Sequence, residues 1–164
     1  VEQDELSKAA EIIKKQWKEL GIEVEIQKFP ISQLEQEVIK PRNYEALLFG
    51  EALGAFPDPL PFWHSTQKKD PGLNLALYEN KEADKLLEEN RKSLDAGVRA
   101  EKLEKFQDII LKDLPAVFLY SPDYVYFISK EIKGIELKNI VDPSKRFSNI
   151  DAWYSKTKRA WKQN

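Results

Sequence analysis

The chain has 164 residues, a length that predicts one domain able to bury a core of its own. Its 26 basic and 28 acidic residues nearly cancel, so neither a nucleic-acid partner nor a disordered acidic tail is expected. The sequence lacks cysteine, which excludes disulfides and thiolate metal sites, and no apolar run reaches the ~20 residues of a membrane span. Methionine is absent even from position 1, and no signal-peptide pattern opens the chain, which suggests a processed or excised segment.

The chain begins with a predicted helix and a predicted strand. Apolar residues with three-to-four spacing predict an amphipathic helix over residues 5–20, and Gly21 is its expected C-cap. Residues 22–27 then alternate apolar and polar side chains, and this period of two predicts a strand.

A second helix and a second strand follow. Ser32 and Glu35 stand in a capping-box pattern, which predicts a short helix as far as about Ile39. A largely apolar run predicts a buried strand over residues 44–49. Because helices and strands alternate at these lengths, we expect 22–27 and 44–49 to be neighbouring parallel strands of one sheet.

The second half of the chain is predicted to start with two amphipathic helices. They lie between residues 82 and 113, with a turn at residues 95–97 between them. Residues 117–119 and 124–128 flank a Ser-Pro-Asp turn and predict an antiparallel strand pair. A short edge strand over residues 135–137 and a last helix capped by Asp151 complete the predicted elements.

The segment that follows the second strand is predicted to be an irregular loop. Gly54 and the three prolines between residues 57 and 61 rule out a continued strand or a long helix. In open α/β sheets, ligands bind where strands end and such loops begin. The loop is therefore the candidate binding site, and a hydrophobic loop that caps the core is the alternative.

No catalytic or metal-binding constellation is complete in the sequence. His64 is the only histidine, and a loop histidine bonded to the backbone is favoured over a catalyst. Glu51 and Asp58 could form a carboxylate pair of the glycosidase kind, although a solvated or loop-capping pair is favoured. We therefore expect no enzyme, no catalytic residue, no metal and no cofactor. One aromatic group could line a binding cleft or fill the core: Phe56, Phe62, Trp63, Tyr78 and Tyr120.

Six phrases follow one another between residues 9 and 136. They are IIKKQWKELGIEVEIQ (12–27), YEALLFG (44–50), FPDP (56–59) with FWHS (62–65), NLALYEN (74–80), EADKLLEENRKSLD (82–95) and RAEKLEKFQDIILKDLPAVFLY (99–120). In this order and spacing they resemble the carboxy-terminal lobe of the extracellular solute-binding proteins of family 5, the peptide/nickel class that feeds ABC importers.

The resemblance implies an α/β fold. It would be a periplasmic-binding-protein-like lobe with a central, mainly parallel sheet flanked by helices and an antiparallel strand pair near the C-terminal half. Residues 1–145 would form the carboxy-terminal lobe, and residues 146–164 would return toward the missing other lobe.

The resemblance also implies a function without covalent chemistry. The lobe would help to capture an extracellular solute, peptide-like or oligosaccharide, by hinge closure and deliver it to a permease. Its partners would be the missing amino-terminal lobe of the same chain, an ABC permease and the solute. The full-length protein would be extracytoplasmic, either periplasmic or anchored as a lipoprotein. The alternative is a self-contained α/β enzyme or protein-interaction domain.

One departure from the family concerns the charge of the solute. Peptide-binding members carry an Asp before the FPDP-like phrase that neutralises the peptide's amino terminus, and aligning the phrase puts Ala55 at that position and Ala52 at a Trp position. A sugar, a blocked peptide or a different geometry that uses Glu51 remain open. The predicted ligand-binding residues are Glu51, Ala52, Gly54, Ala55, Phe56, Asp58, Trp63, Asn74 and Tyr120.

Overall fold

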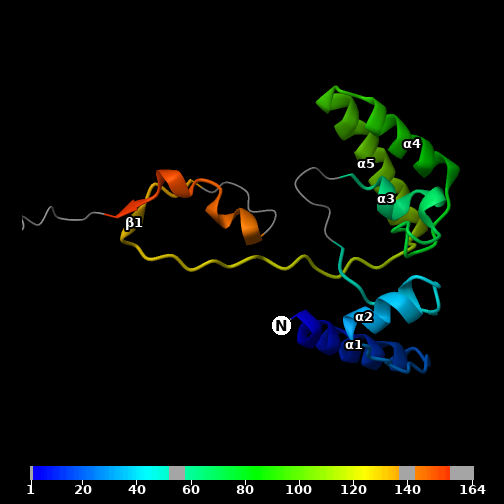
Figure 1. Ribbon diagram of the computed structural model, residues 1–164. Coiled ribbons are helices and arrows are strands. Elements are labelled where there is room, and N and C mark those ends of the chain that lie inside the picture. Colours follow the sequence, from blue (N-terminus) through cyan, green and yellow to red (C-terminus); the bar gives the residue numbers. More distant parts are fainter. Residues whose placement is uncertain (1, 52–57, 137–142, 156–164) are drawn as a thin grey trace, which may run out of the picture. The chain divides into compact units, whose positions relative to one another are not determined.

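The computed structural model describes residues 2–51, 58–136 and 143–155 (Figure 1). These residues form two compact units. The helical unit contains residues 2–51 and 58–117, and the C-terminal unit contains residues 118–136 and 143–155. The two compact units meet in the sequence near residue 117. The predicted boundary at residue 145 separates the lobe from a segment that returns to the other lobe of the longer protein, and it stays a prediction.

Helix α1 (Glu2–Glu19) confirms the first predicted helix. Gly21 adopts φ +79°, where a residue without Cβ is not strained. Its N–H donates to the carbonyl of Lys18 and the N–H of Ile22 to that of Trp17, each at 3.0 Å. These two bonds are the Schellman pattern that satisfies the last carbonyls of a helix.

The second predicted helix is present as two short pieces. Helix α2 (Ile31–Gln33) continues into the π-helical turn η1 (Leu34–Ile39). The expected capping box is wrong, because Pro30 occupies the N-cap position and Ser32 lies inside the first turn. Pro30 cannot supply a side-chain acceptor, so no side-chain hydrogen bond caps this helix.

The strand predictions for residues 22–27 and 44–49 are wrong in this structure. Neither segment has a strand assignment, and the ladder found among the described residues joins β1 (Ile132–Lys133) to β2 (Tyr154–Ser155). That pair is antiparallel, with Ile132 opposite Ser155. Alternation makes a segment suitable for a sheet, but hydrogen bonds to a neighbouring strand create the strand.

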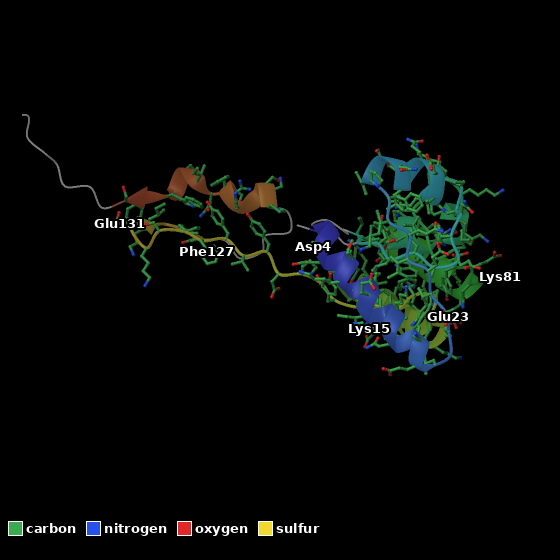
Figure 2. The ribbon with its side chains drawn as sticks, turned by 90° about the horizontal axis from the view of Figure 1, so that it is seen from below. Asp4, Lys15, Glu23, Lys81, Phe127 and Glu131 are labelled. Carbon is green, nitrogen blue, oxygen red and sulfur yellow. The ribbon has the colours of Figure 1, made fainter. Side chains whose placement is uncertain are left out.

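Three further predictions for the last third of the chain are also wrong. Residues 117–119 and 124–128 are extended without a ladder, and Phe127 on this segment is 90% exposed (Figure 2). The edge strand predicted at 135–137 is instead β1, and Leu137 lies outside the described residues. Asp151 lies in a 3₁₀ turn, η4 (Ile150–Ala152), that leads into β2, so the last predicted helix is absent over residues 151–155. A 3₁₀ turn η3 (Pro143–Phe147) precedes it.

Helices α4 (Lys81–Lys92) and α5 (Ala96–Asp113) confirm the two amphipathic helices, and they pack side by side (Figure 1). The side chain of Asn80 caps α4 by accepting the N–H groups of Glu82 and Ala83, at 2.9 and 3.2 Å. Asp95 caps α5 in the same way. Such acceptors satisfy N–H groups that have no partner within a helix.

The core of the helical unit lies between α4, α5 and the chain that precedes them. Its buried members are Tyr78, Ala83, Leu87, Phe106 and Ile110. The predicted irregular loop contains the short helices α3 (Leu60–Trp63) and η2 (Ser65–Gln67). Pro61 lies in the first turn of α3, where its missing N–H costs nothing because that N–H would have no helical partner. The loop of residues 58–80 thereby covers the core and positions the candidate site.

Candidate functional site

Asn74 organises the loop from within. The residue has no solvent-exposed surface. Its Nδ2 donates to the carbonyl oxygens of Trp63, His64 and Tyr78 at 3.2, 3.1 and 2.9 Å, and its Oδ1 accepts the N–H of Tyr78 at 3.0 Å. The amide is therefore fully engaged in holding the loop closed, and a ligand could touch it only after the loop rearranged.

Trp63 lies at the boundary between the loop and the core. Its side chain is half-buried and packs against the core cluster. Its ring meets the ring of Tyr78 edge-on, with 6.4 Å between centroids. This is a favoured arrangement of two aromatic rings. Trp63 thus contributes to packing, while part of its surface remains exposed.

Asp58 is committed to contacts within the chain. Its Oδ1 accepts the N–H of Leu60 at 3.2 Å, which starts α3. Its Oδ2 accepts Nε and Nη2 of Arg91 on α4, at 2.8 and 2.5 Å. Both oxygens have partners, so Asp58 anchors the start of the loop to α4. A partly exposed pair of this kind contributes little stability and mainly fixes geometry.

His64 is a buried loop residue bonded to the backbone, as expected. Its Nδ1 accepts the N–H of Thr66 at 3.2 Å and lies 2.9 Å from the Thr66 hydroxyl oxygen. Its Nε2 lies 3.4 Å from Oε1 of Glu88. The next residue, Ser65, donates its N–H and its hydroxyl to the two carboxylate oxygens of Asp84, at 2.9 and 2.6 Å. The two bonds from Ser65 to Asp84 fasten the loop to α4.

Glu51 ends the described segment that leads into the candidate loop. The residue is exposed, yet crowding by neighbouring atoms raises the pKa of its carboxyl to about 7. Because solvent still reaches the carboxyl, the shift carries little stability, but a pKa of about 7 means that the acid and the carboxylate are both populated near neutral pH.

The structure brings together only part of the predicted set. Asp58, Trp63 and Asn74 lie on one loop, and the Trp63 carbonyl contacts Asn74. Tyr120 is 55% exposed and belongs to the C-terminal unit. The remaining predicted residues lie outside the described residues: Ala52, Gly54, Ala55 and Phe56.

Two residues missed by sequence reasoning connect the parts of the helical unit. Arg42 donates to the carbonyls of Lys68 and Gly72, and the hydroxyl of Tyr44 donates to the carbonyl of Leu75 at 2.6 Å. Burial raises the pKa of Tyr44. No sequence pattern signals these bonds, because their acceptors are backbone carbonyls some thirty residues away, which every residue type possesses.

The described residues contain no group of three metal-ligating side chains of the His, Cys, Asp or Glu type. Within the same residues, no helix combines the length and the apolar character required to cross a membrane.

The relatives of this chain are binding proteins. No family model matches it. It is 31% identical to the oligopeptide-binding protein AppA of Bacillus subtilis (strain 168) over 146 residues, which is 88% of this chain and 26% of that protein. It is also 31% identical to the probable D,D-dipeptide-binding periplasmic protein DdpA of Escherichia coli (strain K12), over 70% of this chain and 22% of that protein.

A solved structure agrees with these relatives. The structure of AppA from Bacillus subtilis in complex with a nonapeptide matches 92% of this chain and 29% of that chain, with a TM-score of 0.69 and 29% identity. The chain belongs to the extracellular solute-binding proteins of family 5. Family 5 membership confirms the resemblance seen in the six phrases, and the mixed α/β class of its fold agrees with the solved neighbour. This family 5 chain spans about a quarter of the length of the curated relatives that it matches.

Proposed function

We propose that the chain is the carboxy-terminal lobe of an ABC-importer binding protein that captures a peptide-like solute by hinge closure and passes it to a permease. The observation that carries this proposal is the similarity over 92% of the chain to a protein solved with a bound nonapeptide. The names of the two relatives also favour peptides over oligosaccharides as the solute class. The relatives are binding proteins rather than enzymes, which supports a role without catalysis.

The setting of the whole protein follows from the same proposal. An amino-terminal lobe of the same chain would complete the cleft, and residues 146–164 would return toward that lobe. The full-length protein would act outside the cytoplasm, in the periplasm or as a lipoprotein. The word periplasmic in the name of the Escherichia coli relative supports this location.

We infer that the solute-facing surface is the segment 51–58, with Trp63 and Tyr120 as further candidate contacts. The partly exposed ring of Trp63 and the exposed ring of Tyr120 support this inference, because aromatic rings provide contact area to peptides and sugars. The contacts of Asn74 and Asp58 favour a supporting role for these two residues, since their polar atoms bond to the protein itself.

Glu51 is the proposed acceptor for a solute ammonium group. The family's Asp position holds Ala55, so another carboxylate must balance a free amino terminus. A carboxyl whose pKa lies near 7 gains its negative charge when an ammonium group approaches it. Such a group suits a site that binds cationic ends reversibly.

Calorimetry on the full-length protein tests the proposed function. The probes are one nonapeptide with a free amino terminus, the same peptide acetylated at its amino terminus, and a maltooligosaccharide. We expect the free peptide to bind best and the acetylated peptide at least about tenfold more weakly, a loss of ~1.4 kcal/mol. Equal binding of the two peptides would remove Glu51 from its proposed role, and binding of the sugar alone would overturn the solute class.

The same measurement on the 164-residue chain is expected to give weak or undetectable binding. Half a cleft presents fewer contacts and gains nothing from closure. Submicromolar affinity of this chain for any of the three probes would show that the site is complete within it.

A further inference from the structure

The guanidinium group of Arg42 is held by backbone carbonyls. Its Nε donates to Lys68 at 3.0 Å and its Nη2 to Gly72 at 2.5 Å, while its Nη1 donates to Ile39 at 2.5 Å. No described carboxylate lies within 4.0 Å of it. All three nitrogen atoms of the guanidinium group donate to carbonyl oxygens. The role of Arg42 therefore depends on the planar arrangement of its N–H donors and not on its charge alone.

The three hydrogen bonds from the Arg42 guanidinium group are called the Arg42 clamp below, and the backbone conformation of Arg42 is consistent with it. Its φ is +59°, a left-handed conformation that is uncommon for a residue with a Cβ. Such conformations persist where the surroundings determine them. The turn also carries hydrogen bonds from the N–H of Arg42 to the carbonyl of Ile39 and from the N–H of Asn43 to that of Val38, at 3.1 and 2.9 Å. The chain therefore leaves η1 in a direction set by Arg42.

Two of the three acceptors, the carbonyls of Lys68 and Gly72, lie on the loop that carries Trp63. Tyr44 adds a bond from its hydroxyl to the carbonyl of Leu75, which is the neighbour of Asn74. Asn74 in turn holds the Trp63 carbonyl. Residues 68–75 are thus bonded on one side to the start of the segment that ends at Glu51, and on the other to Trp63.

We propose that Arg42 is a positioning residue for solute binding. Its hydrogen bonds hold the segment of residues 42–51, which ends at Glu51, against the loop of residues 58–80, which contains Trp63. The proposal rests on the proposed function, in which these two residues face the solute. Lysine cannot replace Arg42, since an ammonium group cannot place three donors in one plane toward carbonyls of two segments.

Hydrogen exchange on the full-length, solute-free protein tests the clamp directly. In Arg42→Lys, the protected amides of Arg42, Asn43 and residues 72–74 should exchange at least about tenfold faster, while the amides inside α4 and α5 keep their rates. Lys40→Met is the matched control, because the side-chain ammonium group of Lys40 donates to Gln36, four residues earlier, and takes no part in the bonds of Arg42. This control should change none of these rates.

Calorimetry with the free nonapeptide supplies the functional readout. Arg42→Lys should weaken binding about tenfold without changing exchange in α4 and α5, and Lys40→Met should bind like the unaltered protein. If Arg42→Lys does not fold, Tyr44→Phe removes one bond of the same connection and should give smaller changes in the same direction.

Three outcomes would overturn the proposal. Unchanged exchange at residues 42–43 and 72–74 would exclude the clamp, and equally faster exchange in α4 and α5 would show a general role in stability. Faster local exchange with unchanged affinity would separate the clamp from solute binding. If the unaltered protein binds none of the probes, the proposed function fails, while the exchange experiment still decides whether the clamp exists.

Discussion

The hydroxyl of Tyr78 donates a hydrogen bond of 2.6 Å to Oδ2 of Asp113, 35 residues later in the chain. Nδ2 of Asn80 donates to the same oxygen at 2.8 Å. Because Asn80 caps α4 and Asp113 is the last residue of α5, one carboxylate joins the beginning of the helical hairpin to its end. The core residue Tyr78 is thereby tied at its polar tip while its ring packs on Trp63.

The bond between Tyr78 and Asp113 should contribute measurably to the stability of the helical unit. Tyr78→Phe keeps the ring and removes only the donor, so we expect the melting temperature to fall by a few degrees. The control is Tyr154→Phe, because Tyr154 is an exposed tyrosine of the C-terminal unit. Equal melting temperatures for Tyr78→Phe and the unaltered chain would show that water replaces the bond without loss.

Acid should weaken the same connection. The hydrogen bonds from Tyr78 and Asn80 hold the pKa of Asp113 below its usual value of 3.8. The folded chain therefore binds fewer protons at Asp113 than the unfolded chain does, and the stabilisation is present above pH 3.8 and is lost as the pH falls through the lower folded-state value. Denaturant unfolding of the unaltered chain and of Tyr78→Phe should differ near pH 6 and converge at the lowest pH values.

Truncation of two leucines of the hairpin should change the free energy of unfolding by very different amounts. Leu87 is 1% exposed in the core, and Leu94 is fully exposed in the turn between α4 and α5. Leu87→Ala should cost about 2–5 kcal/mol because it leaves a cavity. Leu94→Ala should change the free energy of unfolding by less than about 0.5 kcal/mol. Similar costs for the two variants in denaturant unfolding would contradict the observed packing.

Asn74 should be among the least replaceable polar residues of the loop. Asn74→Ala removes the buried amide that donates to three carbonyls and accepts the N–H of Tyr78, and we expect a loss of about 3 kcal/mol or more. Asn43→Ala is the control at an exposed asparagine. A loss of solute affinity in Asn74→Ala without a loss of stability would instead make Asn74 a direct contact, as the sequence predicted.

Glu51 should make solute binding depend on pH. Partial desolvation by neighbouring atoms raises the pKa of the Glu51 carboxyl to about 7, so in the solute-free protein the carboxyl ionises around neutral pH. Affinity for the free nonapeptide should rise from about pH 5 to about pH 7, because the ionised carboxylate attracts the ammonium group, whose own pKa is about 8. Glu51→Gln should weaken binding at about pH 7 by at least about tenfold and remove this rise.

Glu45→Gln is the matched control for Glu51→Gln, because Glu45 is an exposed glutamate on the same segment. It should retain both the affinity and its pH dependence. The stability effect of Glu51 has the opposite sign, since a raised carboxyl pKa makes folding slightly less favourable as the pH rises through 7, and the exposure of the residue keeps that effect small.

Helices α1, α4 and α5 could be predicted from the sequence because their determinants are local, whereas the helix predicted after Asp151 is absent over residues 151–155. The spacing of Leu6, Ile13 and Trp17, the glycine at position 21 and the caps at Asn80 and Asp95 all act within a few residues. The family could also be predicted, because the order of its phrases is a property of the chain alone. By contrast, residues 22–27 have the alternation of a strand but no ladder in the described structure, because a strand is completed by partners that local pattern cannot supply.

Only the tertiary structure decided which polar residues support the candidate site and which remain able to meet a solute. The bond from Arg91 to Asp58 and the bond from Arg42 to Gly72 span 33 and 30 residues, and folding alone brings such groups together. Burial has the same origin, since Asn74 loses all contact with solvent when the loop closes on Trp63 and Tyr78. The sequence determined helices α1, α4 and α5 and the family, and the long-range packing determined that Asn74 and Asp58 are committed to the protein's own backbone and side chains.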